Sequence, residues 1–191
     1  MDFSKISETL ANGLTEELDF SDDQKEIISY AIETTLLSII GTVMVTCLAY
    51  FFDALVPAII AAVFGGLLRK LSGGAHLNTP LKCLIFGALT YSSIGVLAKN
   101  LQIYKLINQN ILLLILLVCF LIVLLLAPVD SHAKPIHSEK LKIKLKISSM
   151  GFVLISFILI SVTNDLLINV SAALGLLYQS ITLLPIFNKR R

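Results

Sequence analysis

The sequence predicts an all-α, polytopic membrane protein with six transmembrane helices, and three observations support this class. Hydrophobic residues make up 56% of the 191 residues and the mean hydropathy is +0.87. Only 15% of residues are charged, against about a quarter in soluble domains. The apolar residues gather in long runs, and the basic residues fall mostly between alternate runs. A water-exposed globular domain is therefore excluded.

Six apolar runs follow a more polar N-terminal part of the chain. A helix needs roughly 17 to 25 residues to cross a bilayer. The two shortest runs, the second and third, therefore either borrow flanking residues or lie partly shielded by their neighbours. Single or paired polar residues, Asp53 and then Asn164 with Asp165, separate the first two and the last two runs. We therefore expect either tight hairpins there or a pair in which one member does not cross fully. The runs cover 34–52, 54–68, 83–98, 111–127, 147–163 and 166–187.

The N-terminal segment, residues 1–30, has the spacing of an amphipathic helix. Its apolar residues recur at steps of three and four, which places them on one helical face. They are Phe3, Ile6, Leu10, Leu14 and Leu18. Such a face suits the membrane surface, and it suits packing against the bundle or a second subunit equally well. We therefore divide the chain into this segment and a six-helix membrane domain, residues 31–191.

The basic residues predict the orientation of the helices. Lysine and arginine are enriched in the cytoplasmic loops of membrane proteins. On an alternating six-helix path, all 15 except Lys99 and Lys105 lie on the side of the N-terminus. This predicts a multi-pass protein of the cell membrane with both termini inside, and it places the segment 69–83 at the cytoplasmic face.

Several functions are disfavoured by composition. The net charge of +2 is small, and no basic patch is interleaved with aromatic residues, so we expect no nucleic-acid partner. The three cysteines form no CxxC pair, which argues against a disulfide framework and a metal site. No nucleotide-binding or metalloprotease motif is present, and we expect no cofactor. Few charged residues lie within the runs, which weakens an ion-coupled carrier.

The segment 69–83 joins the second and third runs and contains His76 and Cys83. Thiol catalysis needs a thiolate and a base in contact, but seven residues along one helix separate two side chains by about 10 Å. The chain must therefore fold back. Gly73 and Gly74 allow the positive φ that ends a helix, and Thr79 before Pro80 is typical of a helix start.

On this interpretation Cys83 lies in the first turn of a helix, where the positive end of the helix dipole favours a thiolate. Spacing alone leaves a second interpretation open, because a cysteine beside an apolar run is often a packing residue and a loop histidine is often solvated. Cys47 and Cys119 fit a packing role, and His132 and His137 in the lysine-rich loop fit solvation.

Two stretches together resemble the accessory gene regulator B (AgrB) family, the membrane peptidases of Gram-positive peptide quorum sensing. The first is Arg69, then Gly74-Ala75-His76, then Cys83, set between the second and third runs. The second follows the fourth run at residues 127–136, where APVD is followed by KPI. Their positions match the family over the whole predicted topology.

The resemblance implies that Cys83 is the nucleophile of a cysteine endopeptidase and His76 its general base, with Arg69 and Gly74 needed for activity. The implied substrate is an AgrD-like propeptide with an amphipathic leader, a central cysteine or serine and an acidic tail. Removal of the tail leaves a thioester on the enzyme, and attack by the substrate's own thiol or hydroxyl gives a cyclic (thio)lactone. A homodimer is also implied.

Other residues of these two stretches and of the basic loop have candidate supporting roles. Backbone N–H groups near Gly73, Gly74 or the start of the third helix are candidates for an oxyanion hole. Asp130 either orients His76 or ends a helix beside Pro128. The basic loop, residues 128–146, holds the acidic tail or contacts anionic lipid. Its lysines are Lys134, Lys140, Lys142, Lys144 and Lys146. The alternative function is a non-enzymatic membrane exporter or transport partner for a peptide.

Overall fold

The computed structural model describes residues 3–15, 20–75, 77, 79–103, 105–129 and 138–188. Seven α-helices and no strand occur in this part of the chain. They are α1 (Phe3–Thr15), α2 (Asp22–Phe51), α3 (Leu55–Ser72), α4 (Pro80–Ile103), α5 (Gln109–Leu126), α6 (Glu139–Val162) and α7 (Leu166–Ile181). The predicted all-helical class is confirmed.

Five helices, α2 to α6, are long and apolar enough to cross a membrane. The remaining apolar helix, α7, has 16 residues and a length of about 24 Å at 1.5 Å per residue, less than a bilayer core. A multi-pass helical protein is thus supported, whereas the count of six spans and the orientation with both termini inside stay predictions.

The chain separates into two compact units, residues 1–44 and 45–191. In the first unit, Ser7 and Ala11 of α1 are buried, and the Ser7 hydroxyl lies 3.3 Å from that of Ser29 at the start of α2. Ile6, Leu10 and Leu14 are exposed. Small residues therefore cover the packed side of α1, and three residues of its predicted apolar face point outward.

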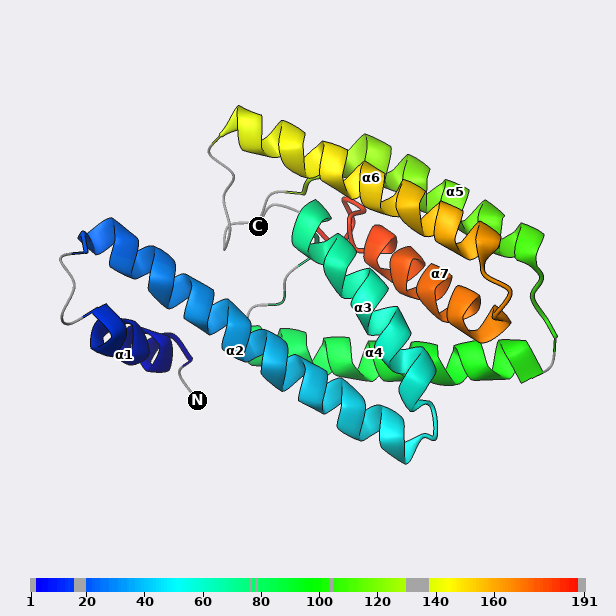
Figure 1. Ribbon diagram of the computed structural model, residues 1–191, viewed down its shortest axis with the longest axis horizontal. Coiled ribbons are helices and arrows are strands. Elements are labelled where there is room, and N and C mark those ends of the chain that lie inside the picture. The colour runs from blue at the N-terminus through cyan, green and yellow to red at the C-terminus, as the bar shows by residue number, and fades with distance from the viewer. Residues whose placement is uncertain are drawn as a thin grey trace. The chain divides into compact units, whose positions relative to one another are not determined.

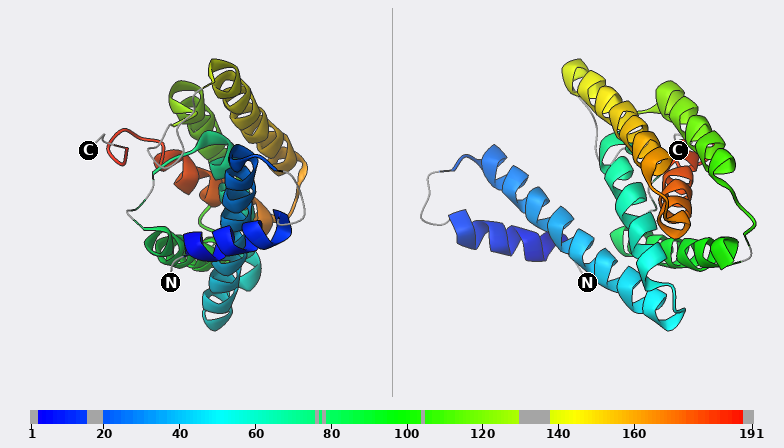
Figure 2. Two further views of the ribbon diagram at one scale, coloured as in Figure 1. Left: turned by 90° about the vertical axis from the view of Figure 1, so that its left-hand side faces the viewer. Right: turned by 45° about the vertical axis from the view of Figure 1, so that its right-hand side comes forward.

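The second unit is a helical bundle in which α7 is the central helix (Figure 1). α7 contacts α3, α4, α5 and α6. In the right-hand view of Figure 2, α5 and α6 run side by side, and the two helices are in contact. Nine of the 16 residues of α7 are buried. A short helix is tolerated here because neighbouring helices, rather than lipid, surround it.

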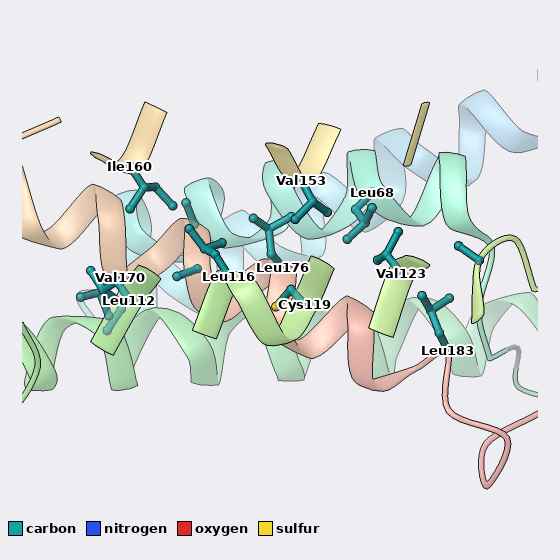
Figure 3. Packing of buried hydrophobic residues seen from close by; sticks show 14 residues of the cluster. Leu68, Leu112, Leu116, Cys119, Val123, Val153, Ile160, Val170, Leu176 and Leu183 are labelled. Carbon is teal, nitrogen blue, oxygen red and sulfur yellow. The ribbon is translucent and has the colours of Figure 1, made fainter. Parts of the chain in front are cut away.

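Aliphatic side chains fill the core of this unit (Figure 3). Leu112, Leu116 and Val123 of α5 pack with Leu176 of α7 and Leu68 of α3, and all five are fully buried. Small residues set the closest approach: a Cβ on Gly95 of α4 would lie 2.8 Å from the Ala58 nitrogen of α3. Close packing of this kind drives helix association within membranes.

The two hairpins expected from the polar breaks are present. Asp53 adopts φ of +50° in the turn between α2 and α3. Asp165 caps the start of α7, where its carboxylate accepts hydrogen bonds from the Leu167 and Ile168 nitrogens at 2.9 and 3.2 Å. An acidic residue therefore lies within the turn at each break.

Candidate functional site

The end of α3 is formed by the two glycines that the sequence singled out. Gly73 has φ of +70° and Gly74 has φ of +133°, values that side-chain-bearing residues rarely adopt. The Gly73 nitrogen donates to the Arg69 carbonyl at 3.0 Å and completes the last turn. The chain leaves α3 here and turns back toward it.

The start of α4 has the predicted capping pattern. Pro80 is the first helical residue, and the Thr79 hydroxyl accepts a hydrogen bond from the Lys82 nitrogen at 3.4 Å. The Cys83 nitrogen donates to the Thr79 carbonyl at 3.2 Å. Cys83 therefore lies in the first turn of α4, where its free thiol is partly exposed.

Arg69 reaches across the reversed segment to the thiol. One guanidinium nitrogen, Nη2, donates to the Ala75 carbonyl and lies 3.9 Å from the Cys83 sulfur. The ends of the segment 69–83, which are 14 residues apart, are thereby brought together. The sulfur therefore lies beside a guanidinium and at the N-terminal end of a helix.

Some predicted residues lie outside the described residues. They are His76, Asp130 and Lys134, as well as His132 and His137 of the same loop. The distance from His76 to Cys83 and the role of Asp130 stay predictions. The described site thus consists of Arg69, Gly73, Gly74 and Cys83 with the groups that hold them.

Polar groups far away in sequence hold this segment in place. The Gln179 amide of α7 is fully buried and contacts Arg69, Ser72 and Gly73. After α7, the Thr182 carbonyl accepts from the Ala75 nitrogen at 3.2 Å. These residues were missed by sequence reasoning, and the only signal available was the presence of glutamine within an apolar run.

The chain after α5 also contacts the segment. Val129 pairs with Gly73 in a parallel bridge, and its nitrogen donates to the Ser72 carbonyl at 2.9 Å. Val129 belongs to the second stretch of the resemblance, residues 127–136. The first part of that stretch therefore lies against the end of α3, next to the candidate site.

The amides proposed for an oxyanion hole are largely engaged. The Gly73 nitrogen bonds to Arg69 and the Cys83 nitrogen to Thr79, as described above, and the Ala75 nitrogen bonds to Thr182. A donor already paired within the chain cannot stabilise a new oxyanion without breaking that bond. Among the described groups, the Arg69 guanidinium is better placed because it already faces the sulfur.

A cavity of about 350 Å³ lies where α5 ends and α6 begins. Lys142 and Lys146, one helical turn apart on α6, line it together with Glu139. Pro128 also lines it and directly precedes Val129, so the cavity adjoins the contact with Gly73. Lys140 and Lys144 are exposed and are not among its lining residues.

The other cysteines have different surroundings. Cys119 of α5 is completely buried within the aliphatic core, as Figure 3 shows. Cys47 is exposed on α2. Neither lies in the first turn of a helix. Cys83 is therefore the cysteine that combines partial exposure with a cationic neighbour in the part of the chain that is described.

The fold and site define a multi-span helical membrane protein with a thiol and a guanidinium at the α3–α4 junction. The family model of accessory gene regulator B matches residues 7–183. The chain therefore belongs to the AgrB family, a component of accessory gene regulator systems.

Relatives from Clostridium and Staphylococcus cover most of the chain. Two AgrB-like proteins of Clostridium perfringens, from strains SM101 and 13, are 29% and 30% identical, each over 96% of this chain and 92% of its own. The accessory gene regulator protein B of Staphylococcus epidermidis is 28% identical over 84% of this chain and 79% of its own. No solved structure matches the chain significantly.

Proposed function

We propose that this chain is a membrane-embedded cysteine endopeptidase that removes the C-terminal tail of an AgrD-like quorum-sensing propeptide and allows the remainder to cyclise. The observation that carries this proposal is the Arg69 guanidinium 3.9 Å from the partly exposed Cys83 thiol in the first turn of α4. Membership in the AgrB family supports the same assignment.

In the first step, the Cys83 thiolate attacks the carbonyl carbon of the scissile peptide bond. The C–N bond breaks, and protonated His76 gives its proton to the departing amine, so the acidic tail leaves with a new N-terminus. The upstream part of the peptide stays on Cys83 as a thioester. Arg69 stabilises negative charge, first on the sulfur and then on the oxyanion.

In the second step, a thiol or hydroxyl within the bound peptide attacks the thioester carbonyl. Its proton passes to His76, the C–S bond to Cys83 breaks, and a cyclic thiolactone or lactone is released. A thioester and a thiolactone are close in free energy, whereas hydrolysis is strongly downhill, so water must be excluded. The partly buried position of the Cys83 thiol at the α3–α4 junction reduces its contact with water.

The substrate tail is assigned to the cavity beside the site. Lys142 and Lys146 give it positive charge, and Pro128 and Val129 connect it to Gly73. An acidic tail held there would place the bond upstream of it near Cys83. The proposal includes an active site that faces the cytoplasm in the cell membrane, with lipid contacts and a homodimer.

The test is processing of an acidic-tailed propeptide co-expressed with the full chain. Cys83→Ala and His76→Ala are expected to abolish release of the tail while the protein still accumulates in the membrane. Cys47→Ala is the matched control, because this exposed thiol on α2 lies outside the site. Normal processing by Cys83→Ala would overturn the proposal.

An intermediate test separates an enzyme from a transport partner. With a propeptide whose internal cysteine is replaced by alanine, the second step is blocked and the upstream fragment should remain attached to Cys83. A hydroxylamine-sensitive adduct of that mass is expected on the wild-type chain. An exporter that does not cut the peptide would give no adduct.

A further inference from the structure

Gln179 occupies a buried position between α7 and the candidate catalytic segment. Its side chain has no exposed surface. The amide nitrogen donates to the Gly73 carbonyl at 2.7 Å and to the Ser72 hydroxyl at 3.2 Å. The amide oxygen accepts from Arg69 Nη1 at 3.4 Å. Both ends of the amide are therefore used.

The chemistry of these partners requires an amide at this position. A backbone carbonyl can only accept a hydrogen bond, and a guanidinium can only donate one. A side chain that serves both must carry a donor and an acceptor. Glutamate at this position would have no donor for Gly73, and methionine, which has a similar shape, would offer neither group. The size of the side chain alone does not explain the glutamine.

Arg69 connects Gln179 to the thiol. One of its terminal nitrogens, Nη1, bonds to Gln179, and the other, Nη2, bonds to Ala75 and faces the Cys83 sulfur. The planar guanidinium is rigid, so fixing one nitrogen also fixes the direction of the other. Gln179 itself contacts Arg69, Ser72 and Gly73 and acts on the sulfur through Arg69.

Gly74 fits against the same cluster. A Cβ at this position would lie 2.7 Å from the Thr182 hydroxyl, 3.1 Å from the Gln179 nitrogen and 3.5 Å from Arg69 Nη1. The backbone of the reversed segment is thus packed directly on the end of α7. The orientation of Arg69 depends on this packing as well as on the hydrogen bond.

We propose that Gln179 is a positioning residue that holds the Arg69 guanidinium toward the Cys83 thiol and anchors the Gly73–Gly74 turn on α7. The inference rests on the proposed function, because it assigns Gln179 a part in activating the same nucleophile. Its chemistry can nevertheless be measured without a peptide substrate. The relevant quantity is the reactivity of the Cys83 sulfur.

The experiment measures iodoacetamide alkylation of Cys83 in the full chain, reconstituted in lipid vesicles, with Cys47→Ser and Cys119→Ala in the background. Gln179→Met and Gln179→Glu are each expected to lower the alkylation rate at pH 7 by about threefold to tenfold, because the Arg69 guanidinium is no longer held toward the sulfur.

The two variants separate positioning from simple space filling. Glutamate has the size of glutamine, so a role in packing alone would leave Gln179→Glu at the parent rate. A carboxylate against Arg69 instead neutralises the guanidinium and should lower the rate at least as much as methionine does. Ser171→Ala is the control, since Ser171 is equally buried on α7 and bonds to the Leu167 carbonyl of its own helix at 2.6 Å.

A double-mutant cycle tests the route through Arg69. In an Arg69→Met background, Gln179→Glu should have a clearly smaller effect on the rate at pH 7, since the guanidinium it orients is gone and only the hydrogen bond to Gly73 is lost. If Gln179→Glu lowered the rate equally with and without Arg69, the inference would be overturned. It would also be overturned if both single variants alkylated within 1.5-fold of the parent rate, which is about half the smallest expected effect. If Gln179→Met does not accumulate in the membrane, the glutamate variant gives the same two readouts.

The outcomes also distinguish this inference from the proposed function. If the parent chain cuts no propeptide but the Gln179 variants slow alkylation, the peptidase assignment fails and the positioning role stands. If the variants alkylate and process at parent rates, the positioning role fails and the peptidase assignment stands.

Discussion

The two ends of the α3–α4 pair each carry a cation beside an anionic or potentially anionic group, but their surroundings differ. Before α3 begins, the Lys99 ammonium bonds to the Asp53 carboxylate and, at 2.8 Å, to the Asp53 carbonyl. The Asp53 side chain is 95% exposed. At the other end, the Arg69 guanidinium contacts the Cys83 sulfur and donates a hydrogen bond to the buried amide of Gln179.

This difference separates a surface ion pair from an organised site. An exposed pair is screened by water and contributes little to stability, typically 0 to about 1 kcal/mol. At the Arg69 end, Gln179 of α7 bonds to the guanidinium and Val129 pairs with Gly73 of the same segment, so the cation has a defined direction. Chemical activation requires that defined direction, which the exposed end lacks.

The largest effect is expected from removing each cation in turn. Arg69→Met should lower the rate of tail release by about a hundredfold or more, the scale seen when a charge-stabilising donor is lost. Lys99→Met is the counterpart at the exposed end and should stay within about twofold. The measurement is cleavage of the propeptide in isolated membranes at equal protein level. Similar losses of activity in both variants would contradict the difference between the two ends.

A smaller but still large effect is expected from Gly74→Ala. The φ of +133° strains any residue with a side chain, which costs about 1 to 3 kcal/mol, and the new Cβ meets the Thr182 hydroxyl. We expect processing to fall by about tenfold or more. Gly151→Ala on α6 is the matched control, because a Cβ there would have no described neighbour within 4 Å outside its own stretch of helix. Parent-like processing by Gly74→Ala would show that the turn tolerates movement.

The paired lysines offer an intermediate test. Replacing Lys142 and Lys146 by alanine should raise the KM for an acidic-tailed propeptide by about threefold to tenfold, with kcat little changed, since two charges in a largely solvated setting are lost. The difference should shrink in high salt. The control is the same double replacement at Lys140 and Lys144, which do not line the cavity. Equal effects of the two double replacements would indicate that the lysines attract the tail through their combined charge and not through a binding site at the cavity.

The smallest effect is expected from Asp53→Asn. The hydrogen bond and the positive charge of Lys99 hold the pKa of Asp53 below its ordinary value. The pair therefore adds stability that is complete above the ordinary aspartate pKa of about 3.9 and is lost as the pH falls below it. Thermal unfolding in detergent should show a slight loss at pH 7 for Asp53→Asn and a smaller one at pH 3. A larger loss of stability at pH 3 than at pH 7 would contradict this pH dependence.

Local features of the site were predictable from the sequence. Gly73 and Gly74 end α3, and Thr79 with Pro80 begins α4, because helix termini are governed by the few residues at each end. Helix lengths were less predictable. Hydropathy marks the apolar part of α2 from residue 34, but its backbone hydrogen bonds continue back to Asp22. The last run ends at 187, whereas α7 ends at Ile181, shortly before Pro185.

The groups that organise the site were beyond the reach of sequence reasoning. Gln179 bonds to Arg69 across 110 residues and to Gly73 across 106. No local pattern encodes such pairing, because it depends on how the α7 helix packs against α3. The basic loop illustrates the same limit: five lysines were equivalent in the sequence, and the cavity selects Lys142 and Lys146 among those described.

The late position of Gln179 also has a consequence for biosynthesis. The Arg69 codon is translated 110 residues before that of Gln179, which at about 5 to 20 residues per second corresponds to roughly 5 to 20 seconds. During this interval the guanidinium has no amide partner and the Gly73–Gly74 turn has no helix to rest on. A nascent chain would thus carry an unassembled site until its last helix joins the bundle, and any chemistry that depends on the oriented guanidinium would begin only then.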